Sequence, residues 1–110
     1  MYKEIKVGIK TIPMEANGAT PIRYKMLFRK DLLSEFQGAE ADSTRVSDMI
    51  PELAYIMAMQ AAKERLADKT MEDYIEWLEQ FAPLDLLNAG GEIASLYISN
   101  MQESSTPKKK

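Results

Sequence analysis

The side chains of this sequence that are best suited to chemistry are carboxylates that gather in one short segment. They are Glu72, Asp73, Glu76 and Glu79. Such a group could bind a hard cation or act as a general acid and base. No Asp-x-Asp loop or glycine-rich cradle accompanies it, and the chain has no histidine and no cysteine, the usual general base and the thiolate metal ligand. We therefore interpret the segment as a solvated helix face, and expect no enzyme activity, no metal and no cofactor.

A second pattern, RYKMLFRK at residues 23–30, interleaves cations with aromatic rings, as nucleic-acid-binding surfaces do. Residues 1–30 carry a net charge of +5, residues 31–103 carry −11, and the last seven residues carry +3. The acidic body would repel phosphates, so we expect no nucleic-acid partner and read the basic segment as a solvated face. The same segregation of charge favours self-association or contact with oppositely charged partners.

Length and hydropathy predict one domain. A chain of 110 residues with 45% hydrophobic residues is long enough for a single core. We expect one α+β domain over residues 1–103 and a disordered basic tail, SSTPKKK, over residues 104–110. No apolar run approaches the roughly 20 residues of a membrane span, and the first residues lack a signal-peptide pattern. We therefore expect a cytoplasmic protein with no membrane contact.

The first elements along the chain are predicted to be two strands. YKEIKV and KTIPM alternate apolar and polar residues, and Gly8-Ile9 between them suits a tight turn with glycine in its first central position. This register pairs Ile5 with Ile12 and puts Val7 and Met14 on the same face. Pro13 cannot donate a backbone hydrogen bond, so its strand should be an edge.

About four helices should cover this hairpin. The first is predicted from an N-cap at Thr20 to Gln37, because Pro21 suits its first position and Gly38 its end. Its apolar stripe would hold Ile22, Met26, Leu33 and Phe36, and Tyr24, Leu27, Phe28 and Leu32 would broaden it. The second should run from near Ser47 to about Lys69 as the centre of the fold.

The third helix should begin at Thr70, where Asp73 completes a capping-box pattern. Gly90-Gly91 should then hinge the chain before a last amphipathic segment. The predicted architecture is a β-hairpin packed on a helical bundle.

Four residues are the candidates for a partner-binding surface: Tyr55, Met59, Trp77 and Phe81. The central helix shows two apolar faces over residues 50–66, and helical geometry leaves Trp77 half exposed. The chain also holds eight methionines, whose flexible side chains suit surfaces that bind variable apolar helices. The alternative is that these methionines fill gaps in the core.

Residues 5–37 resemble the N-terminal half of tail assembly chaperones encoded by long-tailed phages and prophages of Gram-positive bacteria. In that family a strand, a turn and a T(I/Y)P strand lead into a helix of R-Y-x-x-L-F-x-x-D-L character. The matching pieces here are Thr11-Ile12-Pro13, Gly18-Ala19-Thr20-Pro21 and the segment from Arg23 to Leu32. Helices containing Leu53–Met57 and Trp77-Leu78 follow in the expected order.

The resemblance implies a chaperone made in the cytoplasm of the infected host cell. It would bind the tape measure protein, recruit tail tube subunits and leave before the virion is finished, so it is not expected in the mature virion. The alternative is a structural tail or head-tail connector subunit that the virion retains. A small nucleic-acid-binding regulator is disfavoured by charge.

Tail assembly chaperone genes of this kind commonly make a longer product by programmed frameshifting. Lys108–Lys110 require an A-rich run of codons, on which ribosomes slip. The resemblance therefore suggests that residues 104–110 are the linker from which a longer form departs. The alternative is a basic tail that serves solubility.

Overall fold

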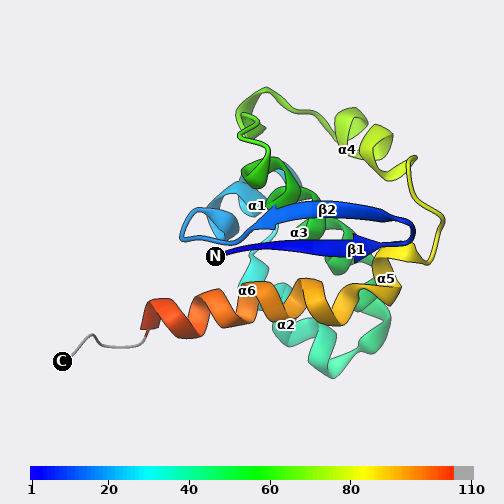
Figure 1. The fold of residues 1–110 in the computed structure, drawn as a ribbon. Helices are drawn as coiled ribbons and strands as arrows, with labels where there is room; N and C mark the ends of the chain where they lie inside the picture. Colours follow the sequence, from blue (N-terminus) through cyan, green and yellow to red (C-terminus); the bar gives the residue numbers. More distant parts are fainter. Residues whose placement is uncertain (106–110) are drawn as a thin grey trace.

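A two-stranded antiparallel hairpin lies across a set of helices in the computed structural model, which describes residues 1–105 (Figure 1). The elements are β1 (Tyr2–Val7), β2 (Lys10–Glu15), α1 (Thr20–Phe28), α2 (Leu32–Ala41), α3 (Val46–Ala61), α4 (Met71–Leu78), α5 (Asp85–Asn88) and α6 (Gly90–Ser105), with 3-10 turns at Ser43–Arg45 and Leu66–Asp68. The predicted α+β class is confirmed. The described residues form six α-helices where about four were expected.

The predicted tail is described only at its start. Helix α6 extends to Ser105, so Ser104 and Ser105 belong to that helix. The prediction of a disordered tail for residues 106–110 lies outside the described residues.

Within the described part of the chain, no helix is both long and apolar enough to cross a membrane.

The hairpin has the predicted register. Ile5 pairs with Ile12, and Gly8 takes a φ of 66° in the turn, a conformation that glycine adopts readily. Met1 and Ala16 exchange both backbone hydrogen bonds, at 2.6 and 2.8 Å. Since hydrogen-bonded and non-hydrogen-bonded pairs alternate in an antiparallel ladder, Pro13 lies in a non-hydrogen-bonded pair and its missing N–H interrupts no ladder bond.

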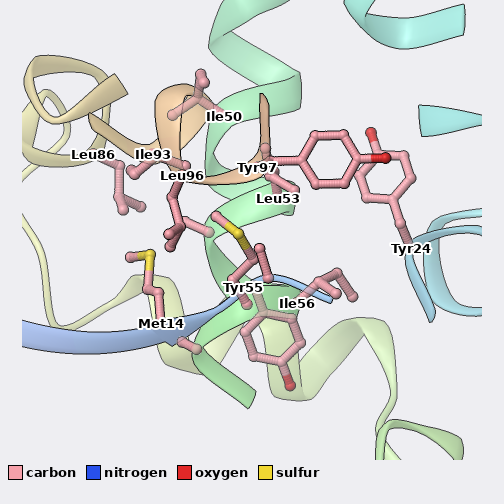
Figure 2. Close-up of a cluster of buried hydrophobic side chains, with 14 of the residues drawn as sticks. Met14, Tyr24, Ile50, Leu53, Tyr55, Ile56, Leu86, Ile93, Leu96 and Tyr97 are labelled. Carbon is pink, nitrogen blue, oxygen red and sulfur yellow. The ribbon is translucent and has the colours of Figure 1, made fainter. Parts of the chain in front are cut away.

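Helix α3 is the centre of the core, as predicted. It packs against β2 and against α1, α5 and α6. Figure 2 shows its side chains Leu53, Tyr55 and Ile56 with neighbours from β2, α5 and α6, namely Met14, Leu86, Ile93, Leu96 and Tyr97. The apolar face of the hairpin (Ile5, Val7 and Met14) is buried in the same cluster. A single hydrophobic core therefore joins the hairpin and the helices.

The predicted end of the central helix was wrong. Helix α3 ends at Ala61 and not near Lys69, because the chain closes it with a Schellman motif. The Glu64 N–H donates to the Met59 carbonyl at 2.9 Å and the Lys63 N–H to the Gln60 carbonyl at 3.2 Å. Lys63 takes the left-handed position of this motif, with a φ of 63°. No glycine marks the position, so the sequence carries no signal for it.

The single helix predicted from Thr20 to Gln37 is two helices. Arg29 is left-handed, with a φ of 61°, and ends α1. Asp31 then caps α2 by accepting hydrogen bonds from the Ser34 N–H at 3.0 Å and the Ser34 hydroxyl at 2.9 Å. An Asp directly before a helical segment is a favoured N-cap, a signal that the apolar periodicity concealed.

The centre of the predicted stripe is wrong in its first three residues, and the buried residues are among those that were expected to broaden it. Ile22, Met26 and Leu33 are exposed, whereas Tyr24, Phe28 and Leu32 are buried. Two short helices set at an angle need not bury the stripe that one long helix would. The buried face is the one whose aromatic rings find partners on α4 and a hydroxyl partner on α3.

The predicted cap of α4 is confirmed. Thr70 accepts the Asp73 N–H at 3.2 Å, and the Asp73 carboxylate accepts the Thr70 N–H at 2.8 Å. Trp77 is half-buried, as predicted. The break between α5 and α6 falls at Ala89, next to the predicted Gly90-Gly91 hinge.

Candidate partner-binding surface

A continuous row of six aromatic rings joins α1, α3 and α4. Neighbouring ring centroids are 4.9 to 5.3 Å apart and the ring planes are tilted by 53 to 75°. In order, the rings are Tyr24, Phe28, Tyr74, Tyr55, Trp77 and Phe81. Tilted and edge-to-face pairs of this kind add about 0.5–1.5 kcal/mol each beyond the burial of area. The row holds α4 against the core and sets the position of Trp77.

Tyr55, a predicted partner-binding residue, is 1% exposed. Its ring lies 5.3 Å from that of Trp77 and meets it edge to face. Burial raises the pKa of the Tyr55 hydroxyl. Tyr55 therefore packs against the Trp77 ring from the core side and has no exposed surface with which to contact a partner.

Met59 and Trp77 line a groove of about 200 Å³, which we call the tryptophan groove. Its lining is Ile12 and Pro13 from β2, Ala58, Met59 and Ala61 from α3, Ala62 directly after α3, and Trp77 from α4. The small side chains of the alanines leave an open space between Met59 and Trp77.

The sequence analysis did not identify the alanines or the strand residues as part of the surface. Three alanines near the end of an apolar helix do indicate a possible groove, because their side chains fill little space.

The groove runs beside the outer edge of β2. Thr11 and Pro13 lie in non-hydrogen-bonded pairs with Lys6 and Glu4, so their carbonyl groups face away from β1. Backbone acceptors therefore border an otherwise apolar hollow. This edge offers hydrogen bonding to a partner segment whose apolar side chains enter the groove.

Phe81 lies at a different hollow. It lines a cleft of about 360 Å³ between the first turns of α3 and the end of α4, which we call the α3–α4 cleft. The lining residues are Ser47, Asp48, Pro51, Glu52, Tyr74, Leu78, Phe81, Ala82, Pro83 and Leu86. Phe81 touches Trp77, at 5.0 Å between ring centroids, but the four predicted residues do not share one groove.

Glu52 is the buried charge of the α3–α4 cleft, with 8% of the residue exposed. Its Oε1 accepts the Tyr24 hydroxyl at 2.6 Å, and the Lys30 Nζ donates to both carboxylate oxygens at 3.2 and 3.0 Å. Burial, and then the hydrogen bond to Glu52, raise the pKa of Tyr24; burial and the charge of Glu52 raise that of Tyr74. This arrangement ties α1 and the α1–α2 corner to α3.

The carboxylates of α4 divide into two kinds. Asp73 belongs to the capping box, and hydrogen bonds from Thr70 hold its pKa below the usual range. Glu72, Glu76 and Glu79 are exposed. Over the described residues, no group of three or more carboxylates is arranged to hold a metal ion.

The two hollows provide apolar side chains for contact with a partner and no unpaired buried charge. The tryptophan groove combines a flexible thioether, an indole and a strand edge, and the α3–α4 cleft has its buried carboxylate already paired. Comparisons of this chain with protein-family models, with curated proteins and with solved structures returned no match.

Proposed function

We propose that this chain is a phage tail assembly chaperone, which binds the tape measure protein and recruits tail tube subunits in the host cytoplasm. The likeness of residues 5–37 to that family supplies the function. The observation that carries the proposal on this molecule is the tryptophan groove, because it provides a place for an apolar segment of a long helical partner. The proposed chaperone leaves before the virion is complete.

The size of the groove favours a protein partner. Pockets for small molecules measure about 300–1,000 Å³, and the tryptophan groove measures about 200 Å³. It therefore suits a side chain that projects from a helix or strand better than a whole ligand. Met59 can adjust its shape to different side chains along a repetitive partner, while Trp77 is held by Tyr55.

The direct test fills the groove without removing core contacts. Ala61→Leu places a larger side chain in the groove, and Ala41→Leu makes the same change at the exposed end of α2. We expect Ala61→Leu to lose co-purification of the tape measure protein while its melting temperature stays near that of the parent. Ala41→Leu should retain binding. Full binding by Ala61→Leu would contradict the proposed groove.

Alanine substitutions distinguish residues that contact the partner from residues that only stabilise the fold. Met59→Ala and Trp77→Ala should weaken co-purification more than they lower the melting temperature. Tyr55→Ala should act mainly on stability, since that ring is buried. Losses of binding that simply follow unfolding at all three positions would assign them to the core alone.

The chaperone function itself is tested on purified virions by mass spectrometry. A chaperone is absent from the finished particle although it is abundant in the infected cell. Detection at a stoichiometry comparable with the tube protein would instead indicate a structural tail or head-tail connector subunit.

A further inference from the structure

The outer face of α1 combines apolar and basic side chains. Ile22 and Met26 are 62% and 49% exposed and stand one turn apart. Lys25 and Arg29, also one turn apart, lie beside them, and the four side chains border one open hollow. Neither cation has an ion-pair partner among the described residues. The face is therefore an apolar stripe with a positive border.

The outer face of α4 is also an apolar stripe with a charged border, but its border is negative. Met71 and Ile75 are 48% and 45% exposed and stand one turn apart. Beside them lie the exposed carboxylates Glu72, Glu76 and Glu79. Ion-pair partners for these three carboxylates are likewise absent from the described part of the chain.

One molecule cannot bring these two faces together. The buried sides of α1 and α4 meet each other through Phe28 and Tyr74, whose ring centroids are 4.9 Å apart. At 100° per residue, the exposed stripe of α1 lies about 120–160° around that helix from Phe28, and the exposed stripe of α4 lies about 60–100° around its helix from Tyr74. The outer face of α1 therefore points away from α4 of the same molecule.

We propose that the outer face of α1 docks on the outer face of α4 of a second copy of this chain. Apolar stripes would meet apolar stripes, and Lys25 and Arg29 would meet the carboxylates. The contact joins two different surfaces, so one copy of the pair keeps its α4 face unused and the other copy keeps its α1 face unused. Such heterologous contacts build rings or open chains rather than closed two-fold dimers.

Helical geometry also sets the direction of the contact. Viewed from the N-terminus of each helix, Lys25 lies anticlockwise of the apolar stripe of α1, and the carboxylates of α4 lie clockwise of theirs. The charged borders fall on the same side only when the two helices run parallel. With Ile22 beside Met71, the rise of about 1.5 Å per residue places Lys25 between Glu72 and Glu76. Arg29, the left-handed residue just beyond α1, borders the same hollow as Lys25.

The expected association is weak and sensitive to salt. Two helices of nine and eight residues offer less than the roughly 1,200 Å² of a standard stable interface. Exposed charge pairs are screened over about 8 Å at physiological ionic strength. Higher salt should therefore shift the chain towards monomer.

Charge exchange tests the proposal by analytical ultracentrifugation of the purified full chain at low salt. Lys25→Glu with Arg29→Glu, and separately Glu72→Lys with Glu76→Lys, should each weaken self-association by about tenfold or more, since attraction becomes repulsion. The fourfold variant, which carries both pairs, exchanges the two borders and should recover self-association. An equimolar mixture of the two double variants should recover it as well.

The control matched to Lys25→Glu with Arg29→Glu is Lys6→Glu with Lys63→Glu, which changes the net charge by the same amount at exposed cations outside both faces. It should associate like the parent, and circular dichroism should show every variant folded. A parent that stays monomeric at low salt and high concentration would overturn the proposal. So would parent-like association of either double variant, or a folded fourfold variant that stays monomeric. The measurement needs no phage component, so its outcome is independent of the proposed chaperone function.

Discussion

At the scale of single residues, Glu52 is a buried carboxylate that links two helices. It accepts hydrogen bonds from Tyr24 and Lys30 while it is almost fully buried. Glu52→Ala should lower the free energy of unfolding by about 1–3 kcal/mol, because it leaves the buried Tyr24 hydroxyl without an acceptor. Glu52→Gln should lose less, since an amide oxygen can still accept from Tyr24. Urea denaturation measures both, and equal losses would show that the charge alone matters.

Asp73 gives the molecule a pH-dependent contribution at residue scale. Hydrogen bonds from Thr70 lower its folded pKa, so its stabilisation is present above the unfolded value of about 3.9 and is lost as pH falls through the folded value. Asp73→Asn carries no titrating group. Melting temperatures of parent and variant should therefore differ near neutral pH and converge as pH falls below about 4. A difference that stays constant into acid would contradict the role of this carboxylate.

At the scale of elements, two positive φ angles decide where helices stop. Arg29 ends α1 and Lys63 ends α3, and both are non-glycine residues in left-handed conformations. These positions are less favourable for residues with a Cβ atom, although glycine also loses more backbone entropy on folding. The helix ends are therefore held by their hydrogen bonds and by tertiary packing.

Lys63→Gly tests this balance. Removal of the Cβ atom relieves the left-handed strain, and we expect the free energy of unfolding to rise by up to about 1 kcal/mol. Lys69→Gly, at an extended φ of −96°, is the matched control and should be neutral or destabilising. Chemical denaturation compares the two, and a loss of stability from Lys63→Gly would show that its side chain contributes more than its backbone strain.

At the scale of the whole molecule, the aromatic row makes α4 part of the core. Trp77 is the single tryptophan of the chain and contacts Tyr55 on the central helix. We expect its fluorescence and the helical circular dichroism signal to change at the same urea concentration, as in a two-state transition. An earlier change in fluorescence would show that α4 detaches first.

Phe81→Leu provides the control for this measurement. It removes the ring at the end of the row and leaves the contact between Trp77 and Tyr55 in place. It should lower stability while both signals still change together. Separate transitions in this variant alone would assign the coupling to Phe81 and not to Tyr55.

Features that depend on neighbouring residues could be read from the sequence of this protein. The turn at Gly8, the pairing of Ile5 with Ile12 and the cap at Thr70 each follow from local backbone geometry and a hydrogen bond that spans a few residues. The central position of α3 followed from its apolar surface on all sides. Such features need no knowledge of what packs against them.

Only the tertiary structure decided which faces are buried and which residues share a hollow. In α1 both the stripe of Ile22 and Met26 and the stripe of Tyr24 and Phe28 could have been buried. The second stripe is buried because its rings meet Tyr74 and its hydroxyl meets Glu52. Likewise, Phe81, which follows α4, lines the α3–α4 cleft, whereas Trp77 on α4 lines the tryptophan groove. A helix can have several apolar stripes, and residues distant in the sequence that pack against it determine which stripe is buried.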